Sequence, residues 1–428
     1  MMKRSYLVFA AALLAASMWI WVLHVPIPHQ PTEAEELGSP RGNFSDLYPR
    51  WLGARELLLH GRNPYGADIT REIQQGFYGR PIDPTRPNDP RDQEGFAYPL
   101  YVVFVLAPTV GLPFAVVQKA FIAVLVSLTA VSVLLWMNAL EWRPSLAARL
   151  TWIILVLSSF PAIWGFLLQQ LTLLVSALVA AAIYAITRRY FVWAGILLAL
   201  ATIKPQLVAL LIVWLGIWVC AAWRERQRLW WSFMATLIAL VAGAEFLLPG
   251  WISQFRAAIA EYYNYTGGGK SVLDLALGPL VGRTLALVLV VISLILVCRD
   301  RHGDEQSSQF RQSLALVLAT TLTIIPTFAP YNQVLLVPAV MLLIANAQPL
   351  WSKNLMSRSL LALAGISIGW PWVAAAELDL AFLFLPSHAV HQAWSAPIYT
   401  SFAIPVAVVA VLLVNANCRS STTANMDR

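Results

Sequence analysis

Charged residues are scarce in this sequence, and their scarcity excludes an ordinary soluble globular protein. Asp, Glu, Lys and Arg make up 12% of the 428 residues, 59% of the residues are hydrophobic, and the mean hydropathy is +0.66. A soluble domain is about a quarter charged and about half apolar. The apolar excess is too large for a core and must face lipid, so we predict an all-α protein that crosses a membrane many times.

Cysteines and nucleotide-binding or hydrolytic motifs are also lacking. The three cysteines, Cys220, Cys298 and Cys418, fall at predicted cytoplasmic positions, so no disulfide is needed. There is no zincin motif, nucleophile elbow, Rossmann fingerprint or Walker sequence. The run Gly267–Gly269 before Lys270 lacks the P-loop spacing, and we interpret it as a flexible exterior flap that contacts substrate.

The basic residues lie mainly in short loops between apolar runs, which explains the net charge of +7. This is the positive-inside pattern of a membrane protein, so no nucleic-acid partner is predicted. We place both termini in the cytoplasm, together with the loops 141–149, 187–190, 223–228, 298–311 and 352–358.

Apolar runs of roughly 17–25 residues predict membrane spans. The first run, 5–25, is longer than the apolar core of a signal peptide and favours an uncleaved span. The run 100–111 is too short to cross and is interpreted as re-entrant or interfacial. About twelve crossings result, with a large first exterior loop (26–113) that carries short helices. The predicted spans are 5–25, 114–140, 150–168, 171–187, 191–203, 207–222, 229–249, 279–298, 312–328, 332–348, 359–376 and 397–415.

Lys204 is an ionisable residue inside an otherwise apolar region. It follows one short run and precedes Pro205, which predicts two short helices meeting at an outward-facing break. Ionisable groups near the membrane interior are functional candidates. The alternative is a lysine that extends to the lipid headgroups. Two cytoplasmic loops must be separated by an even number of crossings. Gln169 and Gln170, between the predicted spans 150–168 and 171–187, therefore fall at an outer turn.

Asp46 lies at the predicted start of a helix in the first exterior loop. Ser45 or Asn43 can cap this helix, Trp51, Ala54, Leu57 and Leu58 form its apolar face, and Gly61 closes it. A carboxylate at a helix start is stabilised by the helix dipole, which predicts a lowered pKa and a permanently ionised group. Catalysis and simple helix-start electrostatics both remain open for Asp46.

The other exterior loops supply weaker candidates. Tyr262, Tyr263 and Tyr265 suit either stacking on sugars or anchoring at the membrane surface. The histidines of loop 377–396 match no standard set of metal ligands, so no metal site is predicted. Additional sugar or acceptor contacts are predicted at Tyr48, Arg50, Tyr65, Tyr98, Lys270 and His388.

Several segments, taken in order, resemble the glycosyltransferase family 87 proteins, polytopic enzymes of the GT-C class. The resemblance covers about residues 40–345. Its elements are Asp46-Leu47-Tyr48, Gly61-Arg62-Asn63-Pro64-Tyr65, Tyr98-Pro99, Gln169-Gln170-Leu171-Thr172, Lys204-Pro205-Gln206 and Pro330-Tyr331-Asn332-Gln333. In two of them this chain departs from the family pattern, because Thr172 replaces an asparagine and no histidine accompanies the late Pro-Tyr element.

The resemblance implies a GT-C-type bundle and transfer of a hexose, with mannose favoured, from a polyprenyl-phosphate donor. The acceptor would be a lipid or glycan hydroxyl at the outer face of the cytoplasmic (inner) membrane, with inversion and without a metal or other cofactor. Asp46 corresponds to the expected general base. Contacts with the donor phosphate or sugar are assigned to Lys204, Gln169, Gln170, Gln206, Tyr331 and Asn332.

Three other functions are alternatives to this one. A secondary transporter would carry charges on several spans at mid-membrane depth, and these spans have almost none. A surface-polysaccharide polymerase or ligase would have its large exterior loop late in the chain, whereas here it comes first. A non-catalytic membrane scaffold is the third alternative.

Overall fold

The computed structural model describes residues 2–27, 45–83, 85, 86, 88–265, 269–326 and 328–424. Within these residues the regular secondary structure is entirely helical, as the sequence predicted. The possible cap Asn43 and the flap glycines Gly267 and Gly268 lie outside the described residues.

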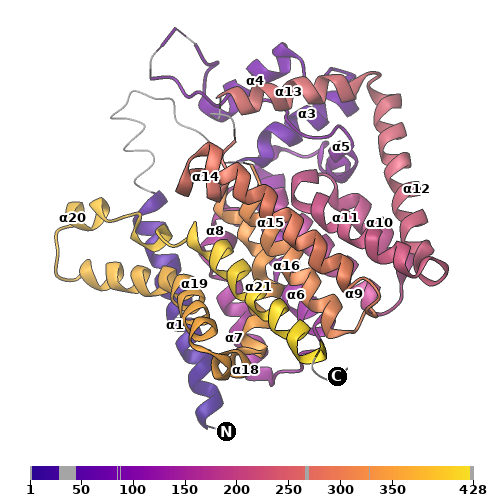
Figure 1. Cartoon of the computed structure of the whole chain (residues 1–428). Coiled ribbons are helices and arrows are strands. Elements are labelled where there is room, and N and C mark those ends of the chain that lie inside the picture. Colours follow the sequence, from indigo (N-terminus) through magenta and orange to yellow (C-terminus); the bar gives the residue numbers. More distant parts are fainter. Residues whose placement is uncertain are drawn as a thin grey trace.

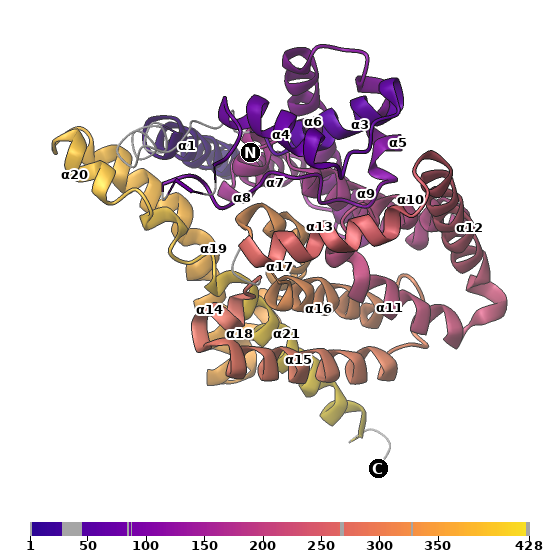
Figure 2. The same cartoon turned by 90° about the horizontal axis from the view of Figure 1, so that it is seen from above.

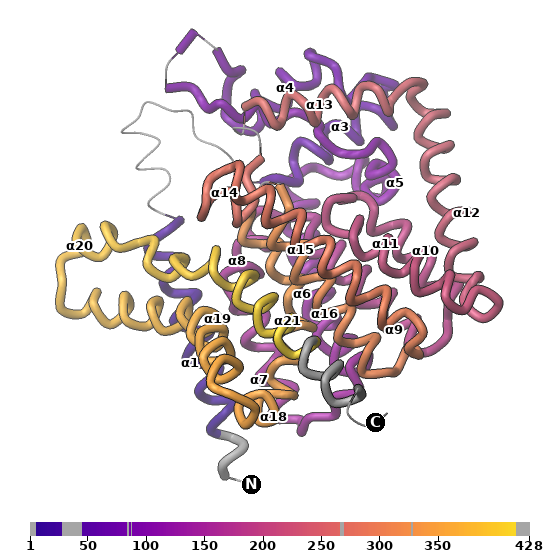
Figure 3. Tube along the Cα trace, in the orientation of Figure 1, coloured from indigo at the N-terminus to yellow at the C-terminus, as the bar shows by residue number. Residues whose placement is uncertain are grey.

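Six helices are long and apolar enough to cross a membrane, and Figure 1 shows them together with the other helices of the bundle. They are α1 (Met2–His24), α6 (Phe114–Ala139), α12 (Trp223–Leu247), α15 (Pro279–Arg299), α19 (Leu355–Ala381) and a segment that includes α21 (Ala403–Ala424). Figure 3 follows α12 along one edge of the molecule up to α13 (Trp251–Tyr265).

Two further spans are broken. α7 (Leu146–Leu157) and α8 (Phe160–Leu167) meet at 54°, and a bend of 62° separates Pro330–Ala345 from α18 (Ala347–Lys353). The first of these two segments consists of η2 (Pro330–Leu336) and α17 (Val337–Ala345). Counting each bent pair as one span gives up to eight candidates. The structure therefore supports a multi-pass protein but does not confirm the predicted count of twelve.

The remaining predicted spans correspond to shorter helices. Three of these are apolar: α9 (Leu171–Thr187), α10 (Phe191–Ala201) and α11 (Pro205–Ala221). The fourth is α16 (Ser308–Ile324), in which nearly every side chain from Phe310 onward is buried. It packs against α11, α15, α17 and α21, which explains why it has no polar face. Three short elements lie between the later helices: α14 (Val272–Leu277), α20 (Ser387–Gln392) and η3 (Ala396–Ile398).

Short helices from two distant parts of the chain cover one end of the bundle (Figure 1). They are α3 (Leu47–His60), α4 (Ala67–Tyr78), α5 (Val102–Leu106), η1 (Ala107–Thr109) and α13. We call them the outer layer. The predicted short helices of the first exterior loop are thus present, and the run 100–111 forms α5 and η1 against α3. α1 begins and α21 ends away from this layer.

The helix after Asp46 has the predicted apolar face and the predicted stop, but not the predicted cap. Trp51, Ala54 and Leu57 are buried, and Gly61 ends the helix with a φ of 67°, a conformation that glycine adopts freely. Asp46 itself occupies the N-cap position, and its side chain makes no capping hydrogen bond. The capping role predicted for Ser45 is therefore wrong, because the helix begins one residue later.

Candidate functional site

A cavity of about 550 Å³ lies between the outer layer and the ends of the helices beneath it. This volume is within the usual range for sites that bind small molecules. Its wall comes from the start of α3, the segment 92–98, the turn before α9, the break between α10 and α11, α13 and η2. Figure 2 shows α13 crossing the middle of the molecule when viewed from this side.

Asp46 is held at the cavity by the turn that precedes α9. Its backbone N–H donates to the carbonyl oxygen of Leu168 at 3.1 Å, which ties the start of α3 to the end of α8. Its carboxylate accepts a hydrogen bond from Nε2 of Gln170. The outer turn predicted at Gln170 therefore contacts the acid of the first exterior loop directly.

Lys204 lies at the predicted break, between the end of α10 at Ala201 and the start of α11 at Pro205. Its side chain is buried, and Nζ donates to Oε1 of Gln170 at 2.7 Å and to Oγ1 of Thr172 at 2.8 Å. The ammonium group therefore lies inside the cavity and does not extend to the lipid headgroups.

The side-chain amide of Gln170 connects Asp46 with Lys204. Gln170 donates from Nε2 to Asp46 and accepts at Oε1 from Lys204, which is the orientation that satisfies both charges. Beyond Lys204, the hydroxyl of Thr172 donates to Oδ1 of Asn332 at 3.0 Å. These five residues form a continuous hydrogen-bond network, which we call the acid–lysine network, and all of them except Thr172 line the cavity.

Arg50 is a second cation in the cavity, one helical turn after Asp46. Its Nη1 donates to the backbone oxygen of Asp46 at 2.8 Å and lies 4.0 Å from Oε2 of Glu94. Its guanidinium carbon is 4.7 Å from the ring centroid of Tyr98. Cations over aromatic faces are stabilised by the ring quadrupole, and Lys204 has the same relation to Tyr98 and Tyr331, at 5.7 and 5.2 Å.

Two more acids, Asp92 and Glu94, line the cavity, and sequence reasoning missed both. They belong to a loop dense in Pro, Asp and Arg, where any single residue looks solvated. The backbone of Glu94 has a φ of 51°, which is uncommon for a residue other than glycine. Neither this backbone conformation nor the low exposure of the Glu94 side chain is visible in the sequence.

Burial raises the pKa of the Asp46 carboxyl, while Arg50 and Lys204 lower it, and burial prevails. The predicted lowering of the Asp46 pKa by the helix start is therefore wrong in direction. Burial also raises the pKa of Glu94 well above its usual value, and the neighbouring Asp92 and Asp46 raise it further. An acid with a raised pKa holds a proton more strongly, which makes its ionised form a better base.

The structure brings most of the predicted site residues into this cavity. Predicted residues in its lining are Asp46, Arg50, Tyr98, Gln170, Lys204, Gln206, Tyr331 and Asn332. Tyr262, Tyr263 and Tyr265 line it from α13, so the tyrosines predicted either to stack on sugars or to anchor at the membrane surface face the same space. Arg256, also on α13, joins them and was not predicted.

Five predicted residues lie outside the cavity lining. Gln169 is buried and donates to the carbonyl of Phe166 at 2.9 Å, so the turn separates it from Gln170. Tyr65 supports the site indirectly, because its hydroxyl donates to the carbonyl of Tyr98 at 2.7 Å. The other three residues that do not line it are Tyr48, Lys270 and His388.

The charged groups of the cavity bear on the kind of ligand it could hold. Among the described residues, no group of three or more His, Cys, Asp or Glu side chains is arranged to hold a metal ion. The cations Lys204, Arg50 and Arg256 instead suit an anionic ligand such as a phosphate.

The comparisons with known proteins give a match to a protein family. The model of glycosyltransferase family 87 matches residues 96–277. This confirms the resemblance predicted from the sequence and supports glycosyltransferase activity. The matched region contains Tyr98, Gln170 and Lys204, but it begins after Asp46 and ends before Asn332. Comparisons with curated proteins and with solved structures returned no match.

Proposed function

Because residues 96–277 match the glycosyltransferase family 87 model, we propose that this membrane glycosyltransferase uses a polyprenyl-phosphate sugar as its donor. It moves a hexose, with mannose the favoured sugar, to a hydroxyl of a lipid or glycan acceptor. The observation that carries this proposal is the acid–lysine network: an acid and a cation face one cavity and are joined by a single amide.

Asp46 is the base in this proposal. The acceptor hydroxyl loses its proton to the Asp46 carboxylate as its oxygen attacks the anomeric carbon, and the bond from that carbon to the phosphate oxygen breaks. The raised pKa of Asp46 suits this role, because the carboxylate then has a greater affinity for the proton. One displacement with one base inverts the anomeric centre.

Lys204 stabilises the leaving group. The departing lipid phosphate gains negative charge, and a buried ammonium group stabilises that charge more strongly than one in water does. Arg50 and Arg256 add positive charge to the same cavity. Because the donor carries its own phosphate leaving group on a lipid, the reaction needs no nucleotide-binding domain.

The cavity lies at the end of the bundle covered by the outer layer, while α1 begins away from this layer. With the amino terminus in the cytoplasm, as the basic loops indicate, the reaction takes place at the outer face of the cytoplasmic membrane. A hydrophobic donor embedded in the bilayer reaches such a site without leaving the membrane.

The test is Asp46→Asn, which keeps the size of the side chain and removes the base. Purified protein is incubated with a panel of polyprenyl-phosphate hexoses and membrane lipid extract, and the products are read by mass spectrometry. We expect a loss of transfer of about 10²–10⁴-fold. Asp68→Asn, on the exposed surface of α4, is the matched control and should transfer normally. Wild-type turnover by Asp46→Asn, in protein that elutes as a folded species, would remove the base assignment.

A further inference from the structure

A second polar cavity, of about 320 Å³, lies next to the cavity that contains Asp46 and Lys204, and we call it the side cavity. Its wall comes mainly from α4, α13 and the segment 93–97, at the end of the molecule where Figure 1 shows the outer layer. Gly95, Ala97 and Tyr265 line both cavities. The two cavities are therefore neighbours that share part of their walls.

The shared wall is a short stretch of backbone. Gln93 and Phe96 line the side cavity, whereas Glu94 lines the first cavity. Gly95 lines both. A Cβ atom added to it would meet, apart from its chain neighbours, only Oγ1 of Thr70, at 4.0 Å. No side chain stands between the cavities at this glycine, so a ligand that fills the first cavity has room to continue into the side cavity.

Charged side chains line the side cavity from two different elements. Arg71 comes from α4 and Glu261 from α13. Among the described residues, Arg71 makes one side-chain hydrogen bond, from Nε to the carbonyl of Ala67 at 3.3 Å, and the carboxylate of Glu261 accepts none. A guanidinium group only donates hydrogen bonds and a carboxylate only accepts them. A hydroxyl group does both, so a ligand with several hydroxyl groups matches this lining.

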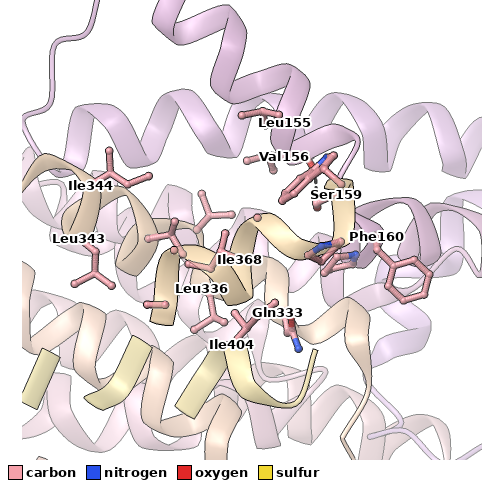
Figure 4. Close-up of a pocket in the computed structure, with 18 of the residues that line it drawn as sticks. Leu155, Val156, Ser159, Phe160, Gln333, Leu336, Leu343, Ile344, Ile368 and Ile404 are labelled. Atoms are coloured by element: carbon pink, nitrogen blue, oxygen red, sulfur yellow. Dashed lines mark hydrogen bonds between the residues drawn. The ribbon is translucent and has the colours of Figure 1, made fainter. Parts of the chain in front are cut away.

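A third cavity, of about 530 Å³ among the helices of the bundle, does not match such a ligand. Figure 4 shows its lining, which is mostly hydrocarbon and includes Leu155, Val156, Leu343 and Ile344. Hydroxyl groups moved there from water would lose hydrogen bonds without gaining partners. A hydroxyl-rich ligand that extends beyond the first cavity therefore fits the side cavity and not this one.

The charges of the first cavity indicate which substrate lies next to the side cavity. From Asp46, one set of contacts leads through an amide to Lys204. Another leads to Arg50, whose Nη1 lies 4.0 Å from Oε2 of Glu94. In a displacement with inversion, the attacking hydroxyl and the leaving phosphate lie on opposite sides of the anomeric carbon. With the donor phosphate at Lys204, the acceptor lies on the side of Glu94, where a second carboxylate repels phosphate.

We propose that the side cavity binds the second sugar of a glycan acceptor, an inference that rests on the proposed function. The terminal sugar of this acceptor lies in the first cavity with its attacking hydroxyl at Asp46. The next sugar lies beyond Gly95, where its hydroxyl groups form hydrogen bonds with Arg71 and Glu261. The acceptor therefore carries at least two sugars before transfer, so the enzyme lengthens an existing glycan and does not start a new one.

The length of the product is the first test. The wild-type protein is incubated with a panel of polyprenyl-phosphate hexoses and membrane lipid extract, and the product is fragmented by tandem mass spectrometry. We expect the new hexose on an acceptor that already carries two or more sugars. A new hexose on a lipid hydroxyl, or on a single sugar, would overturn the side-cavity assignment. Absence of product with every donor would instead count against the proposed function.

Filling the side cavity is the second test. Ala258→Trp adds bulk to it from α13, and Ala257→Trp, at the exposed neighbouring position that lines neither cavity, is the matched control. We measure the half-saturating concentration of membrane lipid extract, and separately KM for the reacting polyprenyl-phosphate hexose. Ala258→Trp should raise the half-saturating concentration of extract about tenfold, because the acceptor loses hydrogen bonds to charged groups. KM for the donor should not change, and Ala257→Trp should change neither value.

Arg71→Met tests the same contact without adding bulk. It removes the guanidinium group from the side cavity and should also raise the half-saturating concentration of extract about tenfold, with KM for the donor unchanged. If this concentration is unchanged in both Ala258→Trp and Arg71→Met, or if the values for donor and extract rise equally, the inference is overturned while transfer itself persists.

Discussion

Charged side chains gather at both ends of α11, and the two clusters differ in what their charges face. At the outer end is the acid–lysine network. At the other end is a group that we call the inner cluster, formed by Arg189, Arg226, Asp304 and Glu305. Arg226 lies 3.8 Å over the ring of Trp218 and donates to the carbonyls of Trp218 and Gly303 at 2.8 and 3.2 Å, and Arg189 donates to Glu305.

The difference separates a structural role from a ligand-binding role. The guanidinium of Arg226 donates to the backbone carbonyls of Trp218, Arg301 and Gly303, so its charge joins α11, α12 and the loop before α16. The charges of the outer cluster line a cavity large enough for a sugar phosphate. Burying charges that are not fully paired within the protein is costly for folding, and such charges are typical of functional sites.

The sharpest test of this comparison removes one cation from each cluster. Lys204→Met should lower kcat by about 10²-fold or more, because the charge on the leaving phosphate loses its buried partner. Arg226→Met should instead lower the free energy of unfolding by about 1.5–3 kcal/mol through lost hydrogen bonds to a charged group. Transfer rate and the midpoint of thermal unfolding in detergent are measured for both. Full activity in Lys204→Met, or lost activity in well-folded Arg226→Met, would break the distinction.

The second-largest effect is expected in the pH dependence of the transfer rate. Asp46 acts as a base only when ionised, and burial raises its pKa. The rate should therefore fall as the pH drops through this raised value, about tenfold per pH unit below it, starting above the value of about 3.9 for an ordinary aspartate. Rates measured at saturating donor across the acidic range check this. An acidic limb at or below the ordinary value would show that Asp46 is not the group that titrates.

A smaller effect is expected from Thr172, which we regard as a positioning residue for Lys204. Thr172→Val keeps the shape of the side chain and removes the oxygen that accepts from Nζ, and one hydrogen bond to a charged group corresponds to about a tenfold loss in kcat. Thr172→Ser restores the hydroxyl and should recover most of the rate. If serine and valine variants are equally slow, the effect comes from packing and not from the hydrogen bond.

Sequence reasoning found the parts of the site that carry local signals. Lys204 was visible because a charge and a proline interrupt an apolar run, and Asp46 because it precedes a helix with a clear apolar face and a closing glycine. Asp92 and Glu94 carry no such signal, since acids in a polar loop are ordinary. Gln169 and Gln170 are neighbours in sequence, and only the turn between α8 and α9 directs one inward and the other to the cavity.

The direction of the Asp46 pKa shift shows the same limit. A helix start is a local property and predicts a lowered value, whereas burial depends on the outer layer and the helices that surround the carboxyl. Asp46 and Gln170 are 124 positions apart, and no local pattern relates them.

The sequence by itself determined that the chain is helical and embedded in a membrane, because the length and hydrophobicity of each run are properties of consecutive residues. It also determined the break at Lys204 and Pro205, since proline cannot continue a helix. Only the tertiary structure decided that Asp46, Gln170, Lys204 and Asn332, which are far apart in the sequence, line one cavity, and that Thr172 links two of them. Those relations depend on how the helices pack, and packing joins residues whose separation along the chain leaves no periodic trace.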